Sequence, residues 1–181
     1  MPLEWSFWYA RWMIQDGLPN RSVGDEFAWN IEFFAPNRLV RTDERRKKAA
    51  PEPDYKYRVV AEVRSMCESE SIAERACVID FGLKVIGDPD VLPAGCKPGD
   101  YVCGEVTLSL THGHAIPPEE SFESLKRKWH VNAIQAHMTP SVQHPEHRYF
   151  MRGGSRIKYE TVWSTASVKS ENYILHCSET L

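Results

Sequence analysis

The sequence predicts a mainly β protein, a single antiparallel β-barrel or sandwich with one helix inserted at about residues 117–129. Residues 27–33 and 106–110 alternate between apolar and polar side chains, which is the period of a half-buried strand. Only 117–129 combines helical spacing of apolar residues with a helix-start signal. The chain has 181 residues, 42% of them hydrophobic, so we expect one domain over 1–181 with a sizeable core.

Patterns typical of β-strands recur along the chain. In residues 5–14 aromatic side chains occur at both odd and even positions, so they would lie on both faces of a strand. This pattern favours a strand that is covered on both faces. β-Branched and alternating residues indicate the later strands, and Gly, Pro, Asn and Asp clusters separate them. The expected strands are 5–14, 27–33, one starting at 57–63, 76–86, 105–111, 131–138, 157–166 and 173–177, with a turn at 169–172 before the last.

The predicted helix opens at Pro117-Pro118-Glu119-Glu120, because proline is tolerated in a first turn and acids there complement the helix dipole. Phe122, Leu125 and Trp129 then lie at i, i+3 and i+7 and give the helix a buried stripe.

Residues 38–53 carry six basic residues, three acids and two prolines without apolar periodicity. We interpret this segment as a mobile basic loop that interrupts the core.

Two Gly-Asp pairs, Gly24-Asp25 and Gly99-Asp100, each precede an alternating strand. Shared turn chemistry is the favoured interpretation, and an internal duplication is the alternative.

The segment from Trp12 to Trp29 resembles the opening of a family of small bacterial proteins that has no assigned activity. The resemblance lies in Trp12, Gln15, Gly17, Pro19, Val23-Gly24-Asp25 and Trp29. This chain has Asp16 where the family's Gly turn is associated with paired cysteines. The resemblance implies a small β-rich fold and no particular chemistry.

A candidate metal site is His112-Gly113-His114 followed by Glu119. Continued alternation from Val106 would point both imidazoles inward, where a divalent transition metal could be chelated with Glu119. The run also resembles the ligand motif of cupins, without their flanking glycines or their second motif. A third ligand would come from Glu119, His130, His137 or His176. The alternative is that both histidines lie on a loop and Glu119 stabilises the helix start.

A candidate nucleic-acid site is the basic loop, through Arg45, Arg46, Lys47 and Lys48, beside a platform of exposed aromatic rings. The net charge of −3 weighs against it, and Trp29, Trp129 and Trp163 are expected in the core.

The sequence contains no Gly-x-Ser-x-Gly elbow, no phosphate-binding loop and no Cys-x-x-Cys pair. We therefore expect a non-catalytic binding or interaction module, and leave enzymatic activity open. Its partner is expected to be a protein or a small molecule rather than nucleic acid or a membrane. With no signal-like start, no long apolar run and five cysteines read as free thiols, the expected location is cytoplasmic.

Overall fold

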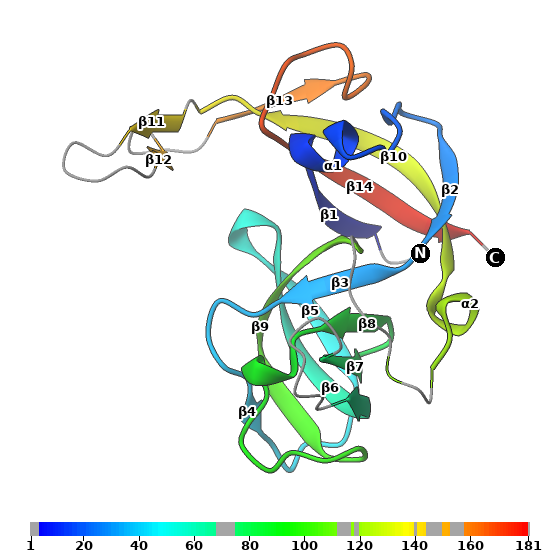
Figure 1. Cartoon of the computed structure of the whole chain (residues 1–181), viewed down its shortest axis with the longest axis vertical. Coiled ribbons are helices and arrows are strands. Elements are labelled where there is room, and N and C mark those ends of the chain that lie inside the picture. The colour runs from blue at the N-terminus through cyan, green and yellow to red at the C-terminus, as the bar shows by residue number, and fades with distance from the viewer. Residues whose placement is uncertain are drawn as a thin grey trace. The chain divides into compact units, whose positions relative to one another are not determined.

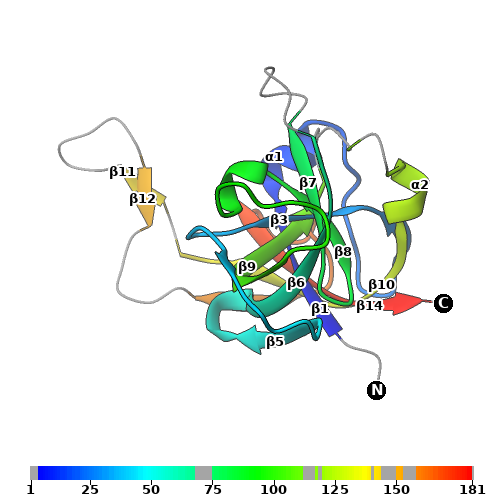
Figure 2. The same ribbon diagram turned by 90° about the horizontal axis from the view of Figure 1, so that it is seen from below.

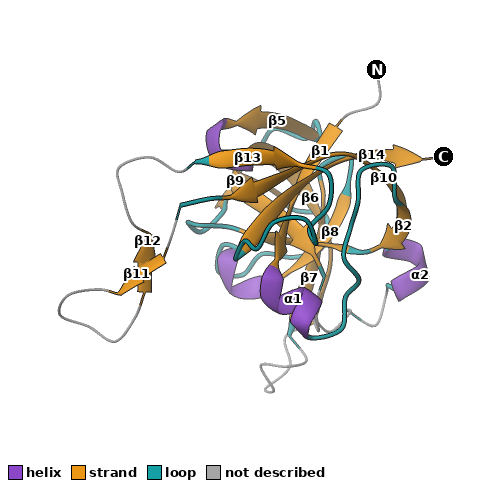
Figure 3. Ribbon diagram, turned by 90° about the horizontal axis from the view of Figure 1, so that it is seen from above, coloured by secondary structure: helices purple, strands orange, loops and turns teal. Residues whose placement is uncertain are grey.

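The computed structural model of the protein describes residues 4–67, 75–111, 117, 120–139, 141–143, 150–152 and 158–180. These residues form a mainly β structure with a closed five-stranded barrel and two short helices (Figures 1 and 3). The predicted fold class is thereby confirmed. Contacts divide the chain into two compact units, the barrel unit (27–129 with 180–181) and the terminal unit (1–26 with 130–179). The single-domain interpretation stays a prediction, and each unit is described by itself.

The barrel unit holds most of the strands. Its elements are β2 (Glu26–Trp29), β3 (Ile31–Phe34), β4 (Val40–Arg41), β5 (Lys48–Glu52), β6 (Lys56–Cys67), β7 (Ala76–Asp80), β8 (Lys84–Gly87), β9 (Tyr101–Leu110) and α2 (Phe122–Leu125). The first residue of β2, Glu26, is counted with the terminal unit. Two single turns of 3₁₀ helix lie at Pro53–Tyr55 and Pro89–Val91.

Five of these strands close on themselves in the order β3, β8, β7, β6, β9 and back to β3 (Figure 2). All neighbours are antiparallel except β3 and β8, which run parallel with Glu32 opposite Ile86. Val106 and Leu108 are fully buried, as their alternation predicts. The barrel core is filled with aliphatic side chains, among them Val59, Ala61, Val63, Val85, Val106 and Leu108, all with no exposed area.

The segment predicted as a mobile basic loop, 38–53, contains β4 and β5, so the loop prediction was wrong at the residues of these two strands, and its mobility stays a prediction. β4 pairs with β9, and β5 pairs with β6 from Lys48 opposite Val60 to Glu52 opposite Lys56. The physical reason is charge compensation: acidic side chains of the same unit pair with Lys47 and Lys48. Pro51 fits because β5 lies at the end of the sheet, where one backbone edge needs no donor.

The run predicted as one strand over 76–86 is two strands, β7 and β8, joined by a tight turn. Gly82 has a φ of +105°, a conformation that other residues rarely adopt, and its N–H donates to the Asp80 carboxylate at 2.9 Å. Asp80 and Gly82 were thus a turn signal inside an otherwise β-branched run.

The inserted helix is shorter than predicted. α2 covers Phe122–Leu125, and β10 (Arg127–His137) begins where the helix was expected to continue. Trp129 is fully buried, but on a strand, with its Nε1 3.2 Å from the carbonyl oxygen of Trp29. A single buried aromatic residue is compatible with both the helical and the strand period. The i+7 spacing of Trp129 from Phe122 therefore led to a helix prediction that is too long.

The two Gly-Asp turns have the same geometry. In each, the glycine has a φ of +92° and the aspartate carboxylate accepts the N–H three residues earlier, from Ser22 at 2.8 Å and from Lys97 at 3.0 Å. The two turns lie in different units. Turn chemistry and an internal duplication both account for the matching hydrogen bonds, so the origin of the sequence similarity stays a prediction.

The terminal unit is a sheet in the order β13 (Tyr159–Val162), β10, β14 (Asn172–Thr180), β1 (Glu4–Ala10). The predicted strand at 5–14 ends at Ala10, where α1 (Arg11–Gln15) begins. A two-stranded sheet, β11 (Ser141–Gln143) and β12 (Phe150–Arg152), belongs to the same unit.

His176 makes the terminal unit sensitive to acid. It lies opposite Ser6 in the β1–β14 pair, with Ser6 Oγ 3.1 Å from its Nδ1. Burial lowers its pKa, and the charge of Glu4 opposes this only in part. The folded chain therefore holds this proton less tightly than the unfolded chain, so stability is lost as the pH falls below 6.5, the ordinary value.

We expect the free energy of unfolding to fall between pH 8 and pH 5, and to fall less in His176→Gln, which keeps a partner for Ser6. Urea unfolding of both chains at the two pH values measures the difference. Equal losses in the two chains would contradict the assignment.

Candidate functional site

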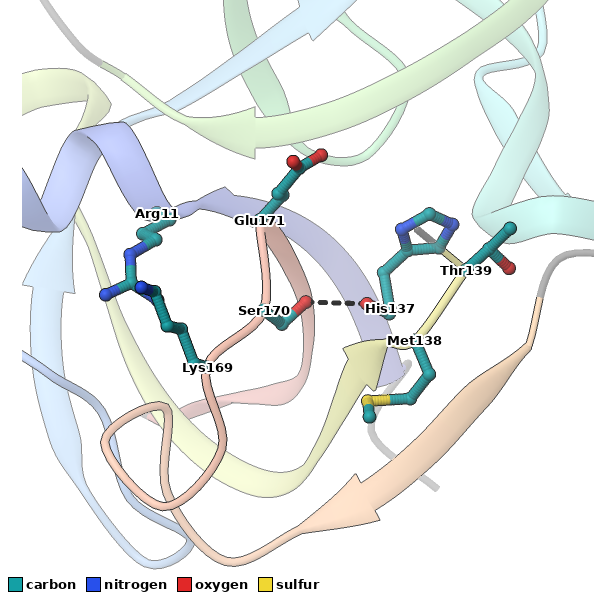
Figure 4. A pocket seen from close by; sticks show the side chains of 7 residues that line it. All are labelled: Arg11, His137, Met138, Thr139, Lys169, Ser170 and Glu171. Carbon is teal, nitrogen blue, oxygen red and sulfur yellow. Dashed lines mark hydrogen bonds between the residues drawn. The ribbon is translucent and has the colours of Figure 1, made fainter. Parts of the chain in front are cut away.

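Two neighbouring cavities in the terminal unit are the candidate binding site. One has a volume of about 500 Å³ and is shown in Figure 4; the other has about 330 Å³. Arg11 and Lys169 line both cavities. The first is completed by His137, Met138, Thr139, Ser170 and Glu171, and the second by Ile14, Gln15, Asn20, Thr165, Ala166, Val168 and Tyr173.

The end of β1 positions Arg11. β1 pairs with β14 up to Ala10 opposite Asn172, and the next N–H, that of Arg11, donates to the carbonyl oxygen of Glu171 at 2.8 Å. Arg11 then opens α1, so its backbone is fixed on both sides while its side chain is left to the cavities.

Tyr173 and Ser170 shape the loop that carries Lys169. The Tyr173 hydroxyl donates to the carbonyl oxygen of Val168 at 2.6 Å and lies 3.2 Å from the N–H of Ser170. Ser170 Oγ lies 2.8 Å from the carbonyl oxygen of His137 (Figure 4). These bonds tie the loop to the end of β10 and place Lys169 at the wall between the cavities.

The opposite side of the larger cavity is built from the end of β10. The ring of His137 lies 5.5 Å from that of Tyr159, at 59°. Thr139 Oγ1 accepts the N–H of Lys158 at 2.8 Å. The hydroxyls of Ser170 and Thr139 therefore hold backbone groups in place.

The electrostatics of this site come from two cations. Within the described residues, neither the guanidinium of Arg11 nor the ammonium of Lys169 has a hydrogen bond or an ion pair. In Figure 4 the Lys169 side chain extends toward Arg11, while the Glu171 carboxylate points away from both. The wall shared by the cavities therefore carries uncompensated positive charge.

The predicted metal ligands His112, His114 and Glu119 lie outside the described residues. The other histidines considered as ligands have different neighbours. The Nδ1 of His130 lies 3.9 Å from a carboxylate oxygen of Glu26, the ring of His137 is tilted against that of Tyr159, and His176 contacts Ser6. Among the described residues no group of three His, Cys, Asp or Glu could hold a metal ion. The metal site stays a prediction.

The predicted nucleic-acid residues are mostly engaged within the barrel unit. Lys47 bridges Asp80 at 2.7 Å and Glu62 at 2.9 Å, and Lys48 pairs with Glu44 at 2.7 Å. Arg45 lies over the ring of Tyr101, 5.6 Å from its centre. Arg46 is exposed and, within the described chain, makes no ion pair. Much of the loop's charge is thus already balanced.

Trp163 was expected in the core and is 69% exposed. The prediction was wrong because β13 ends at Val162, one residue before it, and the inward alternation stops there. Trp129 is buried as expected.

Sequence reasoning did not find Arg11 and Lys169. Arg11 was placed inside a predicted strand and Lys169 in a predicted turn, and neither belongs to a motif. The turn itself was correct, and a lysine in a turn next to a strand end was the available signal.

Comparison with known proteins gives no further guidance: the chain matches no family model, no curated protein and no solved structure. The resemblances to a small bacterial family and to cupins therefore stay predictions. In the described chain, none of the helices has the length and apolar character needed to cross a membrane.

Proposed function

We propose that the protein is a non-catalytic binding module whose ligand site is the pair of cavities that share Arg11 and Lys169. The observation that carries this proposal is the shared wall: two cationic side chains, both without protein partners among the described residues, face two adjoining cavities. Cavities of about 300–1,000 Å³ are the usual size for small-molecule sites.

A binding role is favoured over catalysis by what the nearby hydroxyls do. Ser170 Oγ accepts the N–H of Asn172 at 3.2 Å and lies against two carbonyl oxygens, and Thr165 Oγ1 accepts the N–H of Arg21 at 3.0 Å. A serine or threonine nucleophile needs an adjacent general base to activate its hydroxyl. Here backbone groups and the side-chain amide oxygen of Asn20 occupy these positions, which suits a preformed scaffold.

The described strands of the barrel unit are closely packed. Their inward side chains are fully buried and aliphatic, among them Val59, Val85 and Leu108, which is typical of a small barrel filled by its own side chains.

The test is to fill each cavity separately. A small-molecule library is screened by thermal shift against the native chain, and hits are titrated against Met138→Trp for the larger cavity and Ala166→Trp for the smaller one. We expect the hits to lose at least ten-fold in affinity in one of the two variants. Glu160→Trp, on an exposed face of β13 outside both cavities, is the matched control and should bind normally.

Using the two variants separately keeps the test valid if one of them fails to fold, which circular dichroism will show. Hits that bind both cavity variants as tightly as the control would contradict the proposal, and so would a screen without any hit.

A further inference from the structure

From the charges at the shared wall, we infer that the ligand of this site carries a dianionic group, such as a phosphate monoester or a dicarboxylate, held between Arg11 and Lys169. This inference rests on the proposed function and specifies the chemistry of its ligand.

The first argument is charge balance. Two cations face the cavities, and the carboxylate on the wall, that of Glu171, points away from them (Figure 4). A phosphate monoester carries about −1.5 to −2 charges at pH 7, which matches two cations, whereas a single carboxylate leaves one uncompensated. Lys47 and Lys48 in the barrel unit show the contrast, because acidic side chains of this chain already balance both.

The second argument is donor geometry. A guanidinium presents a planar fork of N–H groups that fits two oxygens of one phosphate or carboxylate, and an ammonium adds a compact point charge. Arg11 supplies the guanidinium and Lys169 the ammonium, each from a backbone segment that hydrogen bonds hold in place. Because the Arg11 N–H bonds to the carbonyl oxygen of Glu171, close to Lys169 in sequence, the two side chains start from neighbouring strand ends.

The third argument is the shape of the site. The cations lie where the two cavities adjoin, so a charged group bound there leaves space on either side. The apolar side chains of Ile14 and Val168 line one cavity, and Met138 lines the other. The uncharged remainder of the ligand therefore has an apolar surface to cover.

The experiment is isothermal titration of the full chain with four probes: inorganic phosphate, glycerol phosphate, malonate and acetate. We expect the dianions to bind at least ten-fold more tightly than acetate. Arg11→Gln and Lys169→Gln should each weaken dianion binding about ten-fold, and the double variant more than either. Both substitutions keep the backbone bonds that shape the site.

Arg46→Gln is the matched control, because it removes an exposed cation that has no ion pair in the described chain and lies in the other unit. It should leave binding unchanged. The inference is overturned if acetate binds as well as the dianions, or if Arg46→Gln weakens binding as much as Arg11→Gln.

The two probe classes separate the two possible sources. Tighter binding of glycerol phosphate than of malonate indicates a phosphorylated ligand, and the reverse indicates a dicarboxylate. Neutral hits that are lost in the cavity-filling variants but kept in Arg11→Gln and Lys169→Gln would overturn the dianion inference and leave the binding module standing.

Discussion

Gly87→Ala should lower the free energy of unfolding by about 2–3 kcal/mol, because the barrel has no room for one methyl group at the end of β8. A Cβ at this position would lie 2.3 Å from Cε1 of Phe33 and 2.6 Å and 2.7 Å from two more ring carbons. Phe33 lies on the neighbouring strand β3 and is only 2% exposed, so the ring cannot move into solvent. Either the ring or the strand must shift.

Urea unfolding of Gly87→Ala, Phe33→Leu and the double variant measures this effect. If the clash is the cause, the double variant loses less stability than the sum of the two single variants. Gly104→Ala is the graded comparison: its Cβ would meet the Leu39 Cδ2 methyl at 2.6 Å, the flexible end of a side chain, so a smaller loss is expected. A strictly additive double variant would contradict this explanation.

Lys47→Met should lower the free energy of unfolding by about 2 kcal/mol at pH 7. The ammonium of Lys47 lies 2.9 Å from Glu62 and 2.7 Å from Asp80, and these carboxylates have side chains only 19% and 16% exposed. Removing the lysine leaves the two carboxylates close together and poorly hydrated, with Arg64 still 3.0 Å from Glu62 but with no cation on Asp80 among the described residues. The expected loss of stability is smaller than for a fully buried triad of charged groups, because the lysine side chain is 32% exposed.

The pH dependence of this variant follows from the carboxyl groups. The hydrogen bond from Lys47 lowers the pKa of Glu62, and burial opposes it. Burial would raise the pKa of Asp80, but the hydrogen bonds from Lys47 and the N–H of Gly82 outweigh it and lower the pKa. The stabilisation is therefore present above their ordinary values of 4.5 and 3.8 and is lost as the pH falls through the lowered values.

The native chain and Lys47→Met should accordingly converge in stability at acidic pH. Lys48→Met is the matched control, since its partner Glu44 is exposed and such surface pairs contribute about 0.2–1 kcal/mol. Equal losses in Lys47→Met and Lys48→Met at pH 7 would contradict the role given to the buried carboxylates.

The alternation of apolar and polar residues predicted the strands correctly where one face of a strand is buried along its whole length. Val106 and Leu108 alternate with polar neighbours and lie on β9, and the Gly99-Asp100 turn starts that strand as expected. The alternation failed where the environment changes along the chain. Thr111, a polar residue at the end of the predicted strand 105–111, is buried, and its hydroxyl donates to the carbonyl oxygen of Asn30 at 2.7 Å.

The candidate site was much harder to predict, because its cations are brought together by tertiary structure. Arg11 and Lys169 are far apart in sequence and meet through the β1–β14 pair. The basic residues that stand out in sequence, such as Lys47 and Lys48, have acidic partners that only the fold reveals. A cluster of charge in sequence is thus a weak guide to free charge in the folded chain.

Closure of the barrel depends on β9, which comes last in sequence among its five strands. β3 finds its two neighbours in β8 and β9, with Glu32 opposite Ile86 and Phe33 opposite Leu108. Pairing of such distant segments loses chain entropy before the contacts between the strands can compensate for it. Barrels of this kind therefore fold in about milliseconds to seconds. During synthesis, β3 and β6 keep unpaired edges until residues 101–110 have left the ribosome. The nascent chain therefore has its greatest exposure to misassociation after β8 and before β9, which places a demand on chaperones or on fast translation of that stretch.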